Sequence, residues 1–167
     1  MSSQKYILSI LVDNEPGVLS RIAGLFSGRG YNIESLSVAQ TAENSALSRI
    51  TMVTIGDDHI IEQITKQLHK LINVITVNDL TEKQYVHREL MLIKVNAKPE
   101  QRAEILRIVD IFRCRVVDVG HEHYIIEVSG DEGKLEALID LLRPVGIIET
   151  ARTGLIALTR EKRIKIK

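Results

Sequence analysis

The apolar positions of the first 80 residues switch between strand-like and helix-like spacing. A strand is predicted over Tyr6 to Val12. After the turn at Asp13 to Glu15, a helix is predicted to start at Pro16, because the fixed φ of proline is already helical and its missing N–H is not needed there. Gly28 and Gly30 end this helix. Its apolar face comprises Val18, Leu19, Ile22, Leu25 and Phe26.

Three more strands are predicted over 32–39, 47–55 and 74–78, and a second helix opens at Gly56 and Asp57. The apolar side of that helix comprises Ile60, Ile64, Leu68 and Leu71. The order strand, helix, strand, strand, helix, strand is typical of the ferredoxin-like fold, an antiparallel sheet with both helices on one face. The other face of the sheet must then be covered by something else.

The same order of elements repeats in the second half of the chain. A strand over 90–97 and a helix starting at Pro99 are followed by a strand pair over 116–119 and 124–128. A helix capped by Asp131 and one or two closing strands around Gly154 complete the pattern. The sequence therefore predicts an α+β protein with two ferredoxin-like βαββαβ modules in tandem, over residues 1–80 and 89–167, joined by a polar linker over 81–88.

Composition narrows the class of protein. The 22 basic and 22 acidic residues cancel, so the chain has no general electrostatic reason to bind nucleic acid or an anionic membrane. The single cysteine, Cys114, excludes an internal disulfide and fits a reducing compartment. No secretory leader or membrane-length apolar run is seen. We therefore expect a soluble, cytoplasmic protein. The basic segment 160–167 is either a final edge strand or a tail that contacts a partner.

Asn14, Gly17 and Asn32 are the candidate ligand-binding residues. A helix N-terminus offers backbone N–H groups to a carboxylate, and Gly17 would let a ligand approach the backbone closely. The two asparagine amides can donate to a carboxylate and accept from an ammonium group. Val18, Leu19 and Ile33 could add apolar contacts, so the set suits a small zwitterion with an apolar side chain. An ordinary capped helix and turn would use the same residues, and spacing alone does not exclude it.

Other candidate chemistry is weaker. His121 and His123, with Cys114 and His87 completing the set, could form the metal site of a metal-responsive regulator. Residues 120–123 also have the pattern of a hairpin turn, in which exposed histidine is ordinary. Asp57, Asp58 and His59 stand where a helix begins and fit capping there. No phosphate-binding glycine motif, nucleophile elbow or zinc-protease motif occurs. Residue patterns therefore favour binding over catalysis.

The turn that follows Asn14 and the segment Asn32-Ile33-Glu34-Ser35-Leu36 carry a family resemblance. The turn resembles that of the broad class of ACT domains. The second segment is more specific and resembles the regulatory (small) subunits of acetolactate synthase, also called acetohydroxyacid synthase. The resemblance spans nearly the whole chain. The matching segments are Asn14 to Arg21, Gly24 to Phe26, Arg29 to Leu36, Leu47 to Thr51, Gln67 to Val74, Arg88 to Val95, Ile111 to Arg113 and Ala151 to Gly154.

The resemblance implies a non-catalytic regulatory subunit in valine, leucine and isoleucine biosynthesis. Residues 1–80 would be an ACT domain that pairs with a second copy and binds valine as feedback inhibitor. The valine-contacting residues would be Asn14, Gly17, Val18, Leu19, Asn32 and Ile33, with the first turn of one chain facing Asn32 of its partner. No cofactor is expected in this chain, because thiamine diphosphate, magnesium and flavin (FAD) would be held by the catalytic large subunit.

Overall fold

The computed structural model describes residues 4–160 and divides the chain into two compact units. The first unit extends to Val86 and takes up the chain again from Leu155, whereas His87–Gly154 forms the second. Each unit contains the predicted strand, helix, strand, strand, helix, strand order. Two ferredoxin-like modules in tandem are therefore confirmed.

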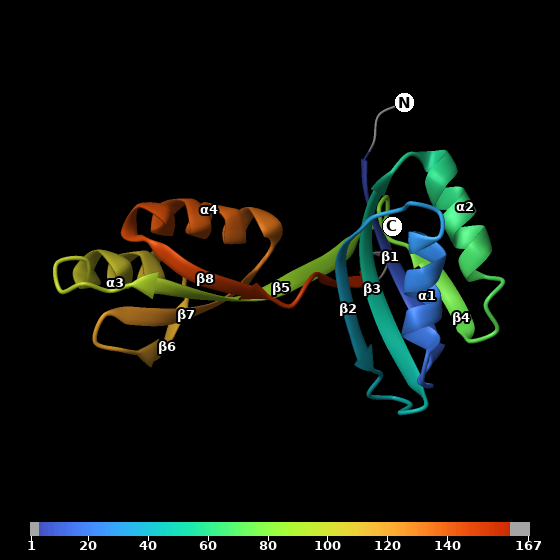
Figure 1. The fold of residues 1–167 in the computed structure, drawn as a ribbon, viewed down its shortest axis with the longest axis horizontal. Coiled ribbons are helices and arrows are strands. Elements are labelled where there is room, and N and C mark those ends of the chain that lie inside the picture. The colour runs from blue at the N-terminus through green and yellow to red at the C-terminus, as the bar shows by residue number, and fades with distance from the viewer. Residues whose placement is uncertain (1–3, 161–167) are drawn as a thin grey trace, which may run out of the picture. The chain divides into compact units, whose positions relative to one another are not determined.

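The sheet of the first unit has the strand order β2-β3-β1-β4, with neighbouring strands antiparallel. Its strands are β1 (Gln4–Asp13), β2 (Ile33–Gln40), β3 (Leu47–Gly56) and β4 (Val74–Asp79). Helices α1 (Val18–Ser27) and α2 (Asp58–Leu68) both cover one face of this sheet (Figure 1). Because β2 and β4 are the outer strands, each of them leaves one edge of the sheet open to further pairing.

Apolar side chains fill the space between these helices and the sheet. Alternate residues of a strand face opposite sides, so one set of β1 side chains points to the helices and the other points away. The core comprises Tyr6, Leu8, Ile10, Val12, Val18, Ile22, Phe26, Ile50, Met52, Ile61, Ile64 and Leu68. Each such side chain contributes roughly 1.5–3 kcal/mol when fully buried, so this core fixes the position of α1 on the sheet.

The second unit repeats this topology. Its elements are β5 (Tyr85–Asn96), α3 (Arg102–Ile111), β6 (Arg115–Val119), β7 (His123–Gly130), α4 (Glu132–Leu142), the 3-10 turn Arg143–Val145 and β8 (Ile147–Arg152). The strand order is β6-β7-β5-β8, which matches that of the first sheet strand for strand. Its separate core is formed by β5, β7 and the two helices, with Ile93, Ile126, Ile105 and Leu138 fully buried.

The two compact units differ from the expected modules at two places. Residues 85–88, predicted as part of a linker, are the first residues of β5. Residues 155–160, predicted to help close the second module, return to the first unit. There β9 (Ile156–Thr159) pairs with β5, and the Arg160 N–H donates to the Gln84 carbonyl at 2.8 Å.

Burial explains this return of the chain. Leu155 and Ala157 are buried with Ile7, Val53 and Leu80 in a small apolar cluster on the sheet face that α1 and α2 leave open. The predicted cover for that face is thus supplied in part by the chain itself. Residue spacing identified a strand near 156–159, but spacing carries no information about which sheet a strand joins.

Two helices begin later than predicted. Gly17 adopts a left-handed φ of 85°, so α1 starts at Val18 and Pro16 lies in the preceding turn. The Gln101 N–H donates to the Lys98 carbonyl in a turn, so α3 starts at Arg102 instead of Pro99. The predicted alternatives for 160–167 concern mainly residues outside the described range. Within residues 4–160, no helix is long and apolar enough to cross a membrane.

Where the chain enters and leaves the second unit, the two segments are joined by side-chain and backbone hydrogen bonds. The Arg152 guanidinium donates to both carboxylate oxygens of Glu89, at 2.9 and 2.6 Å. This bond to Glu89 raises the pKa of Arg152 above its ordinary value. The Thr153 N–H donates to the Leu90 carbonyl at 3.0 Å. Because the planar guanidinium of Arg152 donates to both oxygens of Glu89, this pair holds β5 and β8 in a fixed orientation at that point.

We expect Leu155→Ala to destabilise the first unit by about 2–5 kcal/mol, because it opens a cavity against Ile7 and Val53. Native-state hydrogen exchange should show lost protection in β1 and β3. Leu138→Ala, in the core of the second unit, is the control and should instead expose β5 and β7. Loss of protection in the second unit on changing Leu155 would contradict its assignment to the first.

Candidate functional site

The turn between β1 and α1 leaves the first helix without a side-chain cap. Gly17 is the N-cap residue and has no side chain to accept a hydrogen bond from the first helical turn. By contrast, Asp57 accepts from the Ile60 N–H and Asp131 from the Lys134 N–H, both at 2.9 Å. The N-terminus of α1 therefore retains backbone donors and partial positive charge suited to a carboxylate.

Asn14 is fixed by the loop between β2 and β3. Its backbone N–H donates to the Ala46 carbonyl at 2.7 Å, and its side-chain nitrogen donates to the Ser45 carbonyl at 3.1 Å. Its side-chain oxygen accepts from the Ser48 hydroxyl at 3.1 Å. An amide has two N–H donors and an oxygen with two lone pairs, so one donor and one lone pair remain for a ligand. Asn14 is therefore both a structural and a candidate binding residue.

Asn32 is held at the start of β2. The Thr54 hydroxyl donates to its backbone carbonyl at 2.6 Å, and its side-chain amide donates to the Glu34 carboxylate. Thr54 is fully buried, whereas Asn32 itself is exposed. The backbone at Asn32 is thus anchored, and its amide faces solvent from an outer strand of the sheet.

One chain does not bring Asn14 and Asn32 together. Ser48 holds Asn14 and Thr54 holds Asn32, and these residues are six positions apart (54 − 48) on the same strand, β3. At roughly 3.3 Å per residue, the two anchoring points are about 20 Å apart. A free amino acid cannot span that distance, so a site that uses both asparagines requires a second chain.

The three apolar candidates differ in what they can offer. Val18 is 5% exposed and belongs to the core, so its side chain is occupied by packing. Leu19 is 40% exposed on the first turn of α1. Ile33 is partly buried against the core. Leu19 is therefore the candidate with the most side-chain surface available beside the turn.

Residue spacing did not identify the supports of this site. Ser48 and Thr54 are two of the three hydroxyl residues of β3, and all three, with Thr51, are buried. Hydroxyl residues within this strand were the available signal. Asn73, a third buried support, lies in the connection before β4. Nothing in the spacing of Asn73 distinguished it from an ordinary turn residue.

The residues of the alternative metal site are not brought together. Cys114 and His121 lie at opposite ends of strand β6, and Cys114 packs against the core of the second unit. The His123 ring lies 3.3 Å from the Asp118 carboxylate. Residues 4–160 contain no group of three or more histidine, cysteine or acidic side chains that could hold a metal ion.

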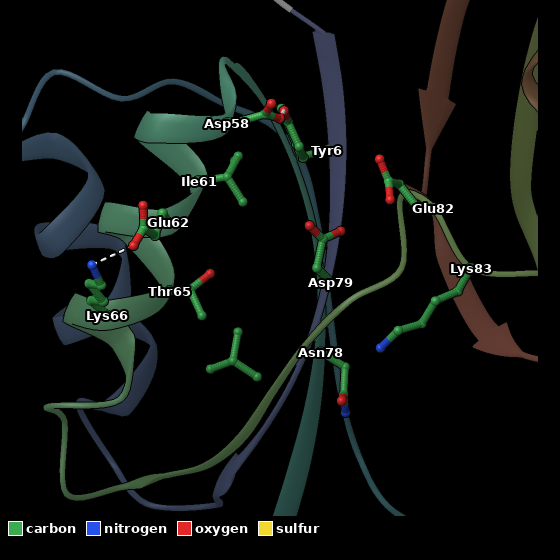
Figure 2. Close-up of a pocket in the computed structure, with 11 residues that line it drawn as sticks. Tyr6, Asp58, Ile61, Glu62, Thr65, Lys66, Asn78, Asp79, Glu82 and Lys83 are labelled. Carbon is green, nitrogen blue, oxygen red and sulfur yellow. Dashed lines mark hydrogen bonds and ion pairs between the residues drawn. The ribbon is translucent and has the colours of Figure 1, made fainter.

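A groove of about 670 Å³ lies between α2 and the segment after β4 (Figure 2). The Tyr6 hydroxyl donates to Asp58, which raises the pKa of Tyr6. Glu62 pairs with Lys66, and this bond lowers the pKa of Glu62. The Asp79 carboxylate accepts from the Thr81 N–H at 2.8 Å. These carboxylates are engaged within the chain, and Tyr6 lies toward the end of β1 remote from the α1 turn.

Comparison with known proteins identifies both units. A family model described as the AHAS small subunit-like ACT domain matches residues 8–76, and one described as the small subunit of acetolactate synthase matches residues 88–161. The chain is 54% identical to a probable acetolactate synthase small subunit of Archaeoglobus fulgidus, over 93% of this chain and 97% of that protein. It is 47% identical to the acetolactate synthase isozyme 3 small subunit of Escherichia coli, over 95% and 97%.

A solved structure agrees with these relatives. The crystal structure of the acetolactate synthase small subunit from Thermotoga maritima superposes with a TM-score of 0.87 at 42% identity, covering 95% of this chain and 99% of that chain. The similarity therefore extends over both units and the segment that returns to the first.

Gly17 and Gly24 give a matched pair for testing the turn. We expect Gly17→Ala to destabilise the chain by about 1–2 kcal/mol, because a Cβ is strained at positive φ even where space is open. Gly24→Ala, exposed within α1, should stabilise it by about 0.5–1 kcal/mol. Urea unfolding measures both changes. A stabilising Gly17→Ala would contradict the left-handed turn.

We expect Cys114 to react slowly with iodoacetamide in the native chain and faster after unfolding, because burial raises the pKa of its thiol. Alkylation rates at neutral pH with and without urea measure this difference.

Equilibrium dialysis of the chain with zinc or nickel should show no stoichiometric metal binding before or after alkylation of Cys114. Stoichiometric metal binding that is lost when Cys114 is alkylated would support a metal site at this cysteine.

Proposed function

This chain belongs to the family of acetolactate synthase small subunits, and on that premise we propose that it binds valine as a feedback inhibitor and regulates a catalytic large subunit. The proposal places valine between the ACT domains of two chains. Thiamine diphosphate, magnesium and FAD would be bound by the large subunit, in a complex located in the cytoplasm. In this proposal the large subunit forms acetolactate, and this chain regulates that reaction.

The observation that carries the proposal is the distance between Asn14 and Asn32, which are held by residues at opposite ends of β3. β2 is an outer strand, so a second copy can pair with it edge to edge. In antiparallel pairing about a two-fold axis, the Ile33 end of one β2 meets the Gln40 end of the other. Gln40 is paired with Ser48, which holds Asn14. Such pairing brings Asn32 of one chain toward the α1 turn of its partner, which supports two equivalent composite sites.

The proposed site matches the chemistry of valine. The valine carboxylate would accept from the backbone donors at the start of α1, and asparagine oxygens would accept from its ammonium group. Each charge-assisted hydrogen bond contributes roughly 1.5–3 kcal/mol, and burial of the valine side chain against Leu19 and Ile33 adds roughly 1.5–3 kcal/mol. After the cost of immobilising the ligand, an affinity of about micromolar to millimolar follows.

Selectivity within the branched-chain amino acids should be modest. One methylene changes binding by only about 1–3 kcal/mol in an apolar pocket. Leucine and isoleucine should therefore bind more weakly than valine without being excluded. Control of the large subunit then needs valine to bind one arrangement of the paired chains better than another, because equal affinity for both would shift nothing.

A subunit-mixing experiment tests the composite site. Gly17→Asp places a carboxylate where the ligand carboxylate would lie, and Asn32→Ala removes the partner's amide. Neither homodimer should bind valine. Random exchange between the two variants should restore about a quarter of the sites, because half of the dimers are mixed and each mixed dimer has one site with both native halves. Calorimetry with valine measures the restored fraction.

Mixing Gly17→Asp with Asn14→Ala is the matched control. Both changes fall on the same half of the site, so no mixed dimer regains an intact site and binding should stay absent. Stimulation of the large subunit should persist in all of these variants. Recovery in the control mixture, or full valine binding by either variant alone, would show that the site is not shared between chains in this way.

A further inference from the structure

Asn73 is a buried polar residue in the connection between α2 and β4. Its exposed fraction is 6%, although its neighbour Ile72 is 94% exposed. A buried amide is costly unless its donors and acceptor are engaged. The position of this side chain therefore has to be explained by its partners.

These partners all belong to the turn that carries the candidate valine site or to α1. The Asn73 side-chain nitrogen donates to the Asp13 carboxylate and to the Glu15 carboxylate, each at 3.2 Å. Its side-chain oxygen accepts from the Arg21 guanidinium at 2.9 Å. Its backbone carbonyl accepts from the Asp13 N–H, also at 2.9 Å.

The geometry restrains the turn on both sides of Asn14. Asp13 and Glu15 flank Asn14, and Arg21 lies on the first turns of α1, with its N–H donating to the Gly17 carbonyl at 3.0 Å. One amide thus ties together the end of β1, the turn and the start of the helix. The bonds to Asp13 and Glu15 also satisfy two carboxylates placed close to where a ligand carboxylate would bind.

We infer that Asn73 is a positioning residue for the valine site, because it holds the turn that presents Asn14 and the α1 donors. The inference rests on the proposed function for its ligand but concerns a residue that does not touch that ligand. An asparagine is required because only an amide supplies both N–H donors and a carbonyl acceptor at this size. Aspartate could still accept from Arg21, but it would repel Asp13 and Glu15.

The central experiment compares Asn73→Asp with the double variant Asn73→Asp, Glu15→Gln. The single change should weaken valine binding by about tenfold or more, since it replaces two charge-assisted bonds by repulsion. The double variant should recover much of that loss, because the glutamine amide can donate to the new carboxylate. A role of Asn73 in overall stability alone would lower the free energy of unfolding and leave the valine dissociation constant of the folded chain unchanged.

Ser9→Ala is the matched control for disturbing a buried polar group. Ser9 is 4% exposed and its hydroxyl accepts from Arg49 at 3.2 Å, on the same sheet but away from the turn. It should leave the valine dissociation constant within about twofold of the native value. If Asn73→Asp fails to fold, Glu15→Ala removes one bond at an exposed position and should weaken valine binding in the same direction.

Amide hydrogen exchange of the ligand-free chain separates this inference from the proposed function. Asn73→Asp should accelerate exchange across residues 13–20, while β3 and the second unit keep their protection. If the native chain does not bind valine, the proposed function is wrong. The exchange pattern would still test whether Asn73 holds the turn in place. Native valine affinity in Asn73→Asp, or acceleration spread evenly over the chain, overturns the positioning role.

Discussion

The fixed length of a β-strand is the constraint on which the functional interpretation depends. β3 carries Ser48 and Thr54 about 20 Å apart, and their hydroxyls hold the two asparagines that a small effector would have to contact. An extended backbone cannot shorten to bring them together. If both asparagines contact one ligand, strand geometry therefore requires that two chains share the site. β2 is an outer strand, and a second copy could pair with its open edge and supply the other asparagine.

The α1 turn combines a rigid frame with open backbone donors. Ile22 and Phe26 fix the helix on the sheet by burial, and the left-handed Gly17 starts it without a capping side chain. The polar bonds around Asn14 and Asn73 then set the path of the chain before the helix. Apolar burial supplies most of the stability, whereas these few hydrogen bonds supply orientation. Such a division suits the reversible binding that is proposed for this turn.

The return of the chain to the first unit connects the outer strand to the rest of the fold. The Leu155 N–H donates to the Ser35 hydroxyl at 3.0 Å, and Ser35 lies on β2 at the point where its pairing with β3 shifts register. Leu155 and Ala157 then bury against Ile7 and Val53. Ser35 of β2 is therefore bonded to a segment that follows directly from the second unit in the chain. Within the second unit, Arg152 donates two hydrogen bonds to Glu89.

The sequence by itself determined the fold class, the order of elements and the family, because apolar spacing is a local property and the Asn32 to Leu36 run is specific. It also selected Asn14, Gly17 and Asn32 from their residue types. Only the tertiary structure decided that α1 starts at Val18, that Val18 is used by the core, and that Leu155 returns to the first sheet. It alone revealed Ser48, Thr54 and Asn73 as supports. The start of α1 is set locally by the left-handed Gly17. The other outcomes depend on contacts between residues distant in the chain, and such contacts leave no periodic signal along it.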